Sequence, residues 1–180
     1  MPKKLVVIHG QSRDQLKTSE QGQYREPMRR GMRPFDSLYF DALTPLGEAQ
    51  AALLRLRLRD TYGIDAATSP AATSTLNRTK QTALIAGFKV DLLKEYSVLD
   101  GISYEDGYDQ LITNITRGWV PEAALGAAAV ILANPPPEPV WFTDVTILAG
   151  LCEHMNLTIQ PDYLWSGRVI ELATRFPTVS

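Results

Sequence analysis

Short apolar runs alternate along this chain with segments that carry helix-start and helix-stop signals. The runs at 4–8 and 140–143 are rich in β-branched and aromatic residues, which is typical of strands. Alternation of such strands with helical segments predicts an α/β domain with a mainly parallel central sheet flanked by helices. At 180 residues and 44% hydrophobic content, the chain is long enough for one sizeable core. We therefore expect a single domain over residues 1–180.

The helix signals are clearest after residue 43. Thr44 is a favoured N-cap, Pro45 suits the first helical position, and Gly63 is a stop signal. These residues predict a helix from Pro45 to about residue 60. Apolar periodicity gives its expected inner stripe as Leu46, Ala49, Leu53 and Leu56. Further helices are expected over 76–86, 108–117, 121–132 and 145–155, and further strands over 64–69, 90–99 and 168–173.

One of the two histidines directly follows the first predicted strand. Residues 6–12 read Val-Val-Ile-His-Gly-Gln-Ser, so His9 falls where the strand gives way to a loop. In α/β proteins the carboxyl edge of the sheet is the usual place for reactive side chains. His9 is therefore a candidate catalytic residue, and Gln11 and Ser12 in the same loop are candidate substrate-binding residues.

The run around His9 resembles the Arg-His-Gly-Glu-Ser signature of the histidine phosphatase (phosphoglycerate mutase-like) superfamily. Residues 43–50 resemble the Leu-Thr-x-x-Gly-x-x-Gln segment of that family's first helix. Residues 74–83 resemble its Ser-Pro-Leu-x-Arg-Ala-x-Gln-Thr-Ala segment, and 140–157 follow its late strand and helix. The resemblance implies a phosphoglycerate mutase-like domain over the whole chain.

The family's reaction uses a nucleophilic histidine in a cationic pocket, because arginine forks match the charged oxygens of a phosphate. The resemblance assigns His9 to the nucleophile and Arg78 to an arginine of this pocket. However, Ile8 stands where the family has another arginine, and Asp144 stands where it has a second histidine. A catalytic carboxylate aligns loosely with Asp100, and Glu105 is the other candidate.

These departures remove two positive groups and place a negative group beside the histidine. A pair of unit charges about 4 Å apart is worth about 4 kcal/mol at an effective dielectric of 20. We therefore do not expect ordinary phosphomonoester hydrolysis. A His9–Asp144 pair is suited to acid/base catalysis instead, because the carboxylate orients the ring and fixes its tautomer. In the preferred reading the chain isomerises, dehydrates or cyclises a small metabolite, and the expected substrate contacts are Arg78, Ile8, Gln11, Ser12 and Tyr104.

Two other functions fit the same residues. A catalytically inactive pseudophosphatase would act as a binding or regulatory protein, with His9 as a structural relic and Asp144 as a helix N-cap. A weak phosphatase or mutase would result if the arginine-rich segment folds over the pocket and restores its positive charge. That segment carries Arg25, Arg29, Arg30 and Arg33. The aromatic candidates for lining a substrate cavity, or for the core, are Tyr104, Tyr108, Trp119 and Trp141.

Composition narrows the class of partner. The net charge is −2, which gives no reason to expect nucleic acid or an anionic membrane as a partner. No apolar stretch approaches the roughly 20 residues that span a bilayer, and the single cysteine, Cys152, fits a reducing compartment. We expect a cytoplasmic protein with a small-molecule substrate and no cofactor or metal, and a homodimer is compatible with the sequence. Cys152 and Glu153 beside His154 suggest a metal site, but no second histidine lies nearby in the sequence, so His154 is expected to be an ordinary helix residue.

Overall fold

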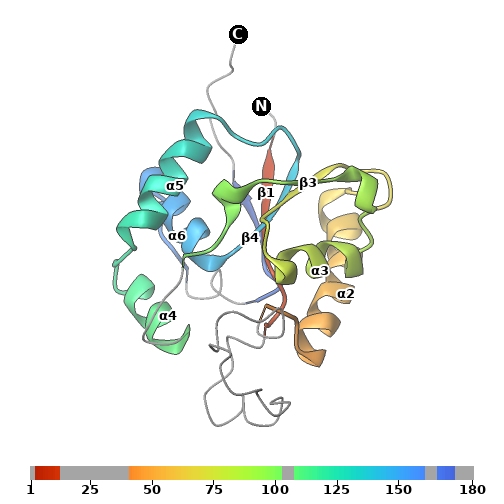
Figure 1. Cartoon of the computed structure of the whole chain (residues 1–180), viewed down its shortest axis with the longest axis horizontal. Coiled ribbons are helices and arrows are strands. Elements are labelled where there is room, and N and C mark those ends of the chain that lie inside the picture. The colour runs from red at the N-terminus through yellow and green to blue at the C-terminus, as the bar shows by residue number, and fades with distance from the viewer. Residues whose placement is uncertain (1–2, 13–40, 103–107, 161–165, 173–180) are drawn as a thin grey trace, which may run out of the picture.

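The strands within the described residues form one five-stranded sheet in the order β3-β2-β4-β1-β5 (Figure 1). The computed structural model describes residues 3–12, 41–102, 108–160 and 166–172. β1 pairs with β4, β4 with β2, and β2 with β3 in parallel, whereas β5 joins β1 as an antiparallel edge strand. The predicted mainly parallel sheet is confirmed. The strands are β1 (Lys4–Ile8), β2 (Ala71–Thr73), β3 (Leu93–Glu95), β4 (Val140–Thr143) and β5 (Val169–Leu172).

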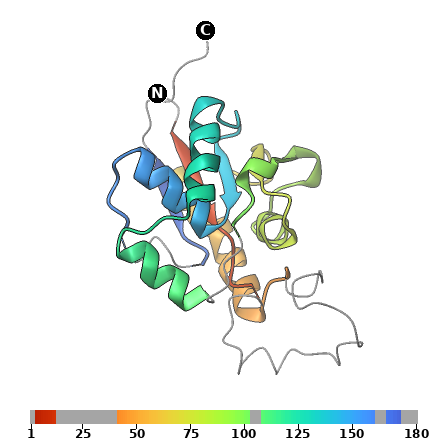
Figure 2. The ribbon, with the colours of Figure 1, turned by 60° about the vertical axis from the view of Figure 1, so that its left-hand side comes forward.

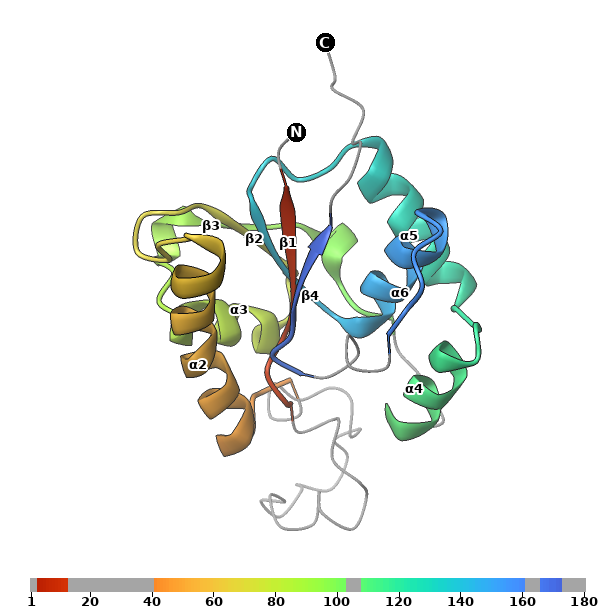
Figure 3. The same ribbon diagram turned by 180° about the vertical axis from the view of Figure 1, so that it is seen from behind.

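Helices cover both faces of this sheet. Figures 1 and 3 show α2 and α3 on one side of the strands and α4, α5 and α6 on the other, and Figure 2 shows α5 in front of the strands. No helix among the described residues is both long and apolar enough to cross a bilayer. The helices are α2 (Pro45–Tyr62), α3 (Asn77–Ile85), α4 (Tyr108–Thr116), α5 (Glu122–Ala133) and α6 (Val145–His154), with short 3₁₀ turns η3 (Val90–Leu92) and η4 (Ser97–Leu99).

The core has two main layers because successive strand residues point to opposite faces of the sheet. In β1, Val6 and Ile8 pack against α5 and α6, whereas Leu5 and Val7 pack against α2 and α3. All five residues of β1 are buried. The loop that follows β1 is therefore held by a central strand that is packed on both faces.

The ends of α2 agree with the prediction from the sequence, but its buried face does not. The Thr44 side chain accepts a hydrogen bond from Gly47, and Gly63 ends the helix in the left-handed region with φ 67°. The expected inner stripe is wrong, because Leu46, Leu53 and Leu56 are about half exposed or more. The helix instead buries Gly47, Ala51, Leu54 and Leu58. The small residues in this set let the helix backbone approach the sheet and the loop after β1.

The second strand also lies later than predicted. Residues 64–69 form a turn in which the Asp65 side chain accepts hydrogen bonds from Ala67 and Thr68, and the strand begins at Ala71. Asp65 competes with the strand ladder because its side chain satisfies nearby backbone donors. The mixed segment over 90–99 contains only a three-residue strand between two 3₁₀ turns.

Lys4 ties β1 to the proline-rich run before β4. Its ammonium donates hydrogen bonds to the carbonyl oxygens of Pro136, Pro137 and Glu138 at 2.8–2.9 Å. The side chain is buried and lies over the Trp141 ring, 5.3 Å from its centroid. Burial lowers the pKa of Lys4, and the nearby Glu138 carboxylate opposes that shift. This lysine therefore serves as an internal anchor.

Replacing Lys4 by methionine is expected to lower the free energy of unfolding by about 1–3 kcal/mol, because the carbonyl oxygens lose a donor while the apolar stem is retained. Urea unfolding measures this loss. Lys3→Met is the matched control, since Lys3 is two-thirds exposed and pairs with Glu171 at the surface. That variant should change stability by less than about 0.5 kcal/mol. Equal losses in the two variants would contradict the anchoring role of Lys4.

Candidate functional site

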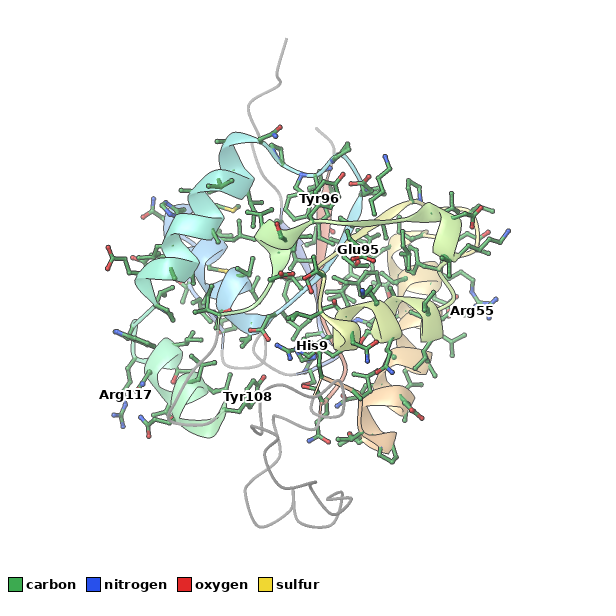
Figure 4. The ribbon with its side chains drawn as sticks, in the orientation of Figure 1. His9, Arg55, Glu95, Tyr96, Tyr108 and Arg117 are labelled. Carbon is green, nitrogen blue, oxygen red and sulfur yellow. The ribbon has the colours of Figure 1, made fainter. Side chains whose placement is uncertain are left out.

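His9 and Asp144 meet because each directly follows one of two paired strands. β1 and β4 are parallel neighbours, with Ile8 opposite Thr143. The next residues, His9 and Asp144, therefore leave the same edge of the sheet side by side. The backbone N–H of His9 donates to the Thr143 carbonyl at 3.2 Å, and His9 Nε2 lies 3.2 Å from Asp144 Oδ2. Figure 4 shows His9 at this lower edge of the sheet.

Both ring nitrogens of His9 face hydrogen-bond acceptors. Nδ1 lies 2.7 Å from the carbonyl oxygen of Gly10, and Nε2 lies against the Asp144 carboxylate. Neither partner has a proton to give, so a ring that carries both protons satisfies both contacts. The His9 side chain has no exposed surface. The geometry therefore fits a buried imidazolium that donates in both directions.

The two oxygens of Asp144 have separate partners. Oδ1 caps α6 by accepting hydrogen bonds from the Thr146 backbone and hydroxyl, each at 3.0 Å. Oδ2 lies between His9 Nε2 at 3.2 Å and the Arg78 guanidinium at 3.5 Å. Burial alone would raise the pKa of Asp144, but the hydrogen bond from His9 and the positive charges of Arg78 and His9 hold it far below its usual value. This carboxylate is therefore the negative centre of the site.

Gly101 closes the space beside the Asp144 carboxylate. A Cβ atom added at Gly101 would lie 2.9 Å from Asp144 Oδ2 and closer still to the carbons of that side chain. The following residue, Ile102, donates its backbone N–H to the Thr146 hydroxyl at 3.0 Å. The segment after η4 thus packs directly against the start of α6. The Asp144 side chain is confined by this backbone as well as by its charged partners.

Asp41 is a site residue that the sequence analysis missed. Its carboxylate lies 3.2 Å from the Arg78 guanidinium and accepts the backbone N–H groups of Asn77 and Arg78. The residue at the N-cap of α3 is Leu76, which provides no side-chain acceptor. Leucine at the N-cap was the one sequence signal for such a partner. The backbone N–H groups of the first helical turn then need a hydrogen-bond acceptor from another part of the chain. Asp41 supplies it and orients Arg78.

The loop after His9 is seated on α2 and α3. The Gly10 N–H donates to the Thr82 hydroxyl at 3.0 Å, and the Gln11 N–H donates to the Gln50 side chain at 2.8 Å. The Gln11 side-chain oxygen accepts from the Thr44 hydroxyl at 2.8 Å, and Ser12 is buried in a bridge to the segment before α2. The observed contacts of Gln11 are thus structural. Substrate binding by Gln11 and Ser12 stays a prediction.

Of the remaining predicted site residues, Asp100 makes its contacts elsewhere, and the roles of the others stay predictions. Asp100 accepts hydrogen bonds from the Thr75 N–H at 2.6 Å and hydroxyl at 2.7 Å, which fixes the turn before α3. No hydrogen bond or ion pair joins Asp100 to His9 within the described residues. Ile8 is fully buried in the layer beneath α6, so its role as a substrate-facing wall stays a prediction. The predictions for Tyr104, Glu105, Arg25, Arg29, Arg30 and Arg33 fall outside the described residues.

The aromatic residues divide between core and surface. Trp141 is completely buried, and its indole N–H donates to the Glu138 carbonyl at 2.8 Å, so it belongs to the core and does not line a cavity. Trp119 is half exposed, and Tyr108, at the start of α4, is half buried (Figure 4). His154 donates to the Leu125 carbonyl at the surface. In the described part of the chain, no three His, Cys, Asp or Glu side chains are grouped to hold a metal ion.

Comparisons with known proteins agree with this architecture. A family model of the histidine phosphatase superfamily (branch 1) matches residues 40–104, which include Asp41 and Arg78 but neither His9 nor Asp144. The solved structure of a protein from Thermus thermophilus, TTHB049, is 18% identical, covers 96% of this chain and 94% of its own, and has a TM-score of 0.58. A structure described as mycobacterial hydrolase 1 is 16% identical, with coverage of 100% and 92% and a TM-score of 0.58.

A third similar structure is that of the open reading frame Rv3214 from Mycobacterium tuberculosis, at 17% identity, with coverage of 97% and 92% and a TM-score of 0.53. Likeness at such identities shows the fold alone. No match is found among curated protein sequences. The family model covers the segment that carries Arg78, and the fold likeness extends over almost the whole chain. Together these findings support membership of the histidine phosphatase superfamily.

Proposed function

We propose that this chain is a pseudophosphatase, a binding or regulatory protein that keeps the superfamily fold without phosphoryl transfer. The observation that carries the proposal is the position of Asp144 Oδ2, which lies between His9 Nε2 and the Arg78 guanidinium. In the family, a phosphoryl group is taken up between the nucleophilic histidine and the arginines. Here a carboxylate of the chain itself makes those two contacts, so the site is already filled by an internal anion.

The charges of the site support this proposal. Arg78 and a doubly protonated His9 contribute two positive charges, and Asp41 and Asp144 contribute two negative ones. Such a cluster is electrically balanced before any ligand arrives. A phosphate dianion has to be desolvated to enter, and its attraction to Arg78 is offset by repulsion from the two carboxylates. Within the part of the chain that the structure describes, the site therefore lacks the excess of positive charge that phosphate recognition needs.

The hydrogen bonds of His9 also oppose nucleophilic attack. A histidine attacks phosphorus through the lone pair of an unprotonated ring nitrogen. A ring that carries both protons donates from Nδ1 to the Gly10 carbonyl and from Nε2 to Asp144. Neither nitrogen then presents a lone pair, and the ring has no exposed surface. The simplest role for His9 is to hold the carboxylate that starts α6.

Acid/base catalysis, the function preferred from the sequence, is the second candidate. The contact that favours it is the His9–Asp144 hydrogen bond, since a carboxylate that orients an imidazole is a common general acid/base unit. The burial of both side chains places it second, because a substrate must reach Nε2 or the carboxylate to exchange a proton. A small molecule that the wild type isomerises, dehydrates or cyclises, and that His9→Ala leaves unchanged, would favour this candidate over the pseudophosphatase.

The direct test of the proposal is phosphate release from a broad panel of phosphomonoesters at several pH values. Wild type and His9→Ala are expected to release phosphate equally, at the rate of the buffer alone, because no nitrogen lone pair faces a substrate. Turnover by the wild type that disappears in His9→Ala would overturn the proposal. It would also show that a phosphate displaces Asp144.

Nitrogen NMR of the protein labelled with ¹⁵N-histidine provides a second test that needs no substrate. The chain has only two histidines, so comparison with His154→Gln assigns the His9 signals. We expect both ring nitrogens of His9 to carry protons, as the two acceptor contacts require. A His9 nitrogen without a proton would contradict the geometry on which the proposal rests.

A further inference from the structure

The exposed side of α2 carries an apolar stripe that the described residues leave uncovered. Leu46, Leu53 and Leu56 are 54%, 65% and 48% exposed, and Ala49 is exposed between them. Their spacing of three, four and three residues places all four on one side of the helix. The buried side of α2 faces the sheet with a different set of residues. We call Leu46, Ala49, Leu53 and Leu56 the α2 stripe.

We propose that the α2 stripe is a self-association surface, on which α2 of a second copy of this chain packs antiparallel across a two-fold axis. Three leucines at heptad-like spacing on an exposed helix are a seam of the kind that pairs with another helix. In an antiparallel pair centred between residues 51 and 52, Leu46 of one copy lies near Leu56 of the other. Leu53 then lies near Ala49, so that large and small side chains alternate along the seam.

The charges beside the stripe favour a second copy over an unrelated partner. Glu48 and Arg55 are both exposed and lie seven residues, or two turns, apart on the same flank of the stripe. In the same antiparallel register, Glu48 of one copy faces Arg55 of the other, and the two-fold axis repeats this pair. The exposed Ala52 lies close to the axis and lets the helices approach. In a two-fold homodimer the same surface of each copy must be complementary to itself, and this arrangement of charges meets that requirement.

The opposite flank of the stripe and the surroundings of Arg55 are consistent with this packing. The flank opposite Glu48 and Arg55 carries Gln50, which already binds the loop after His9. A Cβ atom added at Gly87, after α3, would lie 3.2 Å from the Arg55 side chain. Arg55 is thus positioned beside the end of α3 at the outer margin of the molecule (Figure 4). The stripe and its charged flank include none of the residues that contact His9 or Asp144, so the inference is independent of the proposed function.

Sedimentation velocity of the full-length protein over a range of concentrations tests the proposal. Because a single helix pair is at the small end of specific interfaces, we expect a reversible equilibrium between a 20.0 kDa monomer and a species of twice that mass. Leu53→Glu at the centre of the stripe should weaken association by about 30-fold, the effect of losing one interface hot spot. Leu84→Glu replaces an exposed leucine of α3 outside the stripe and should leave association unchanged.

Charge reversal distinguishes the proposed register from any other contact made by α2. Glu48→Arg and Arg55→Glu should each weaken the dimer, and the double variant should restore it, because the facing pair is re-formed with its signs exchanged. These substitutions are on the surface, so circular dichroism should show an unchanged fold. A protein that is monomeric at every concentration would overturn the proposal. So would a dimer insensitive to Leu53→Glu, or a double charge reversal that fails to restore association.

Discussion

Asp144→Asn is expected to lower the free energy of unfolding at neutral pH by about 3–5 kcal/mol, the cost of removing one partner from a buried ion pair. Asparagine keeps the size of the side chain and an oxygen that can cap α6. The substitution removes only the negative charge, which leaves the buried His9 and the partly buried Arg78 as positive neighbours. A domain of this kind has a total stability of about 5–15 kcal/mol, so the loss is a large part of it. Urea unfolding followed by circular dichroism measures the difference.

The loss of unfolding free energy in Asp144→Asn should depend on pH in a defined direction. The pKa of Asp144 is lower in the folded protein than in the unfolded chain, so the carboxylate stabilises the folded state above about pH 4. That contribution is lost as the pH falls through the folded-state pKa. The difference between wild type and variant should therefore be largest near neutral pH and shrink below about pH 4. A difference that stays constant on acidification would show that the charge of Asp144 is not responsible.

Two companion variants separate the charge from the other roles of a carboxylate. Asp144→Ala also removes the cap of α6 and should lose about 1 kcal/mol more than Asp144→Asn. Asp100→Asn removes a carboxylate that is hydrogen-bonded to Thr75 but makes no ion pair among the described residues, so about 1–2 kcal/mol is expected there. Equal losses in Asp100→Asn and Asp144→Asn would contradict the view that Asp144 balances buried positive charge.

Gly47→Ala is expected to destabilise the fold by about 3 kcal/mol, at the upper end of the usual effect of overpacking. A Cβ atom on Gly47 would overlap the carbonyl oxygen of Gln11, and one on Gly10 would overlap the carbonyl oxygen of Gly47. Both obstacles are backbone atoms, so neither can move aside as the tip of a flexible side chain does. Thermal unfolding measures the loss, and the ¹⁵N-histidine spectrum should show a changed environment for His9 on the same loop.

Gly126→Ala is the matched control for Gly47→Ala. Gly126 lies within α5 and is exposed, and a Cβ atom there would meet nothing within 4 Å. The same substitution should therefore stabilise the protein by about 0.5–1 kcal/mol, because alanine loses less backbone freedom in a helix than glycine. Opposite signs at these two glycines are the expected result. A similar loss in both variants would mean that general helix effects, and not the contact with the loop after His9, explain Gly47→Ala.

The meeting of His9 and Asp144 could be predicted from the sequence because both residues end parallel strands. Once two strands are neighbours, the residues that follow them leave the sheet at one edge, whatever the detail of the helices. The family resemblance supplied the pairing, because Asp144 stands where the family has the second histidine of its pocket. The contact between Asp41 and Arg78 could not be predicted in this way, because Asn77 lies 36 positions after Asp41 and the intervening sequence contains no pattern that links them. Its physical cause, an uncapped helix start, becomes visible only after α3 is placed.

The buried face of α2 could not be predicted either, because two apolar stripes run along this helix. Leu46, Leu53 and Leu56 form one stripe, and Leu54 and Leu58 belong to the other. Leucine content favours the first stripe, and only the close approach at Gly47 and Ala51 selects the second. Small residues are weak signals in a hydrophobic pattern, yet they decide which side of a helix can reach the sheet.

The burial of α6 makes the chain's single cysteine a chemical reporter of unfolding. Every residue from Val145 to Cys152 is buried, and burial raises the pKa of the Cys152 thiol to about 11. In the folded protein this thiol is shielded and remains protonated, so thiol reagents can reach it only when the helix opens. Labelling rates at Cys152 therefore measure the opening of the same helix that begins at Asp144, without any engineered probe.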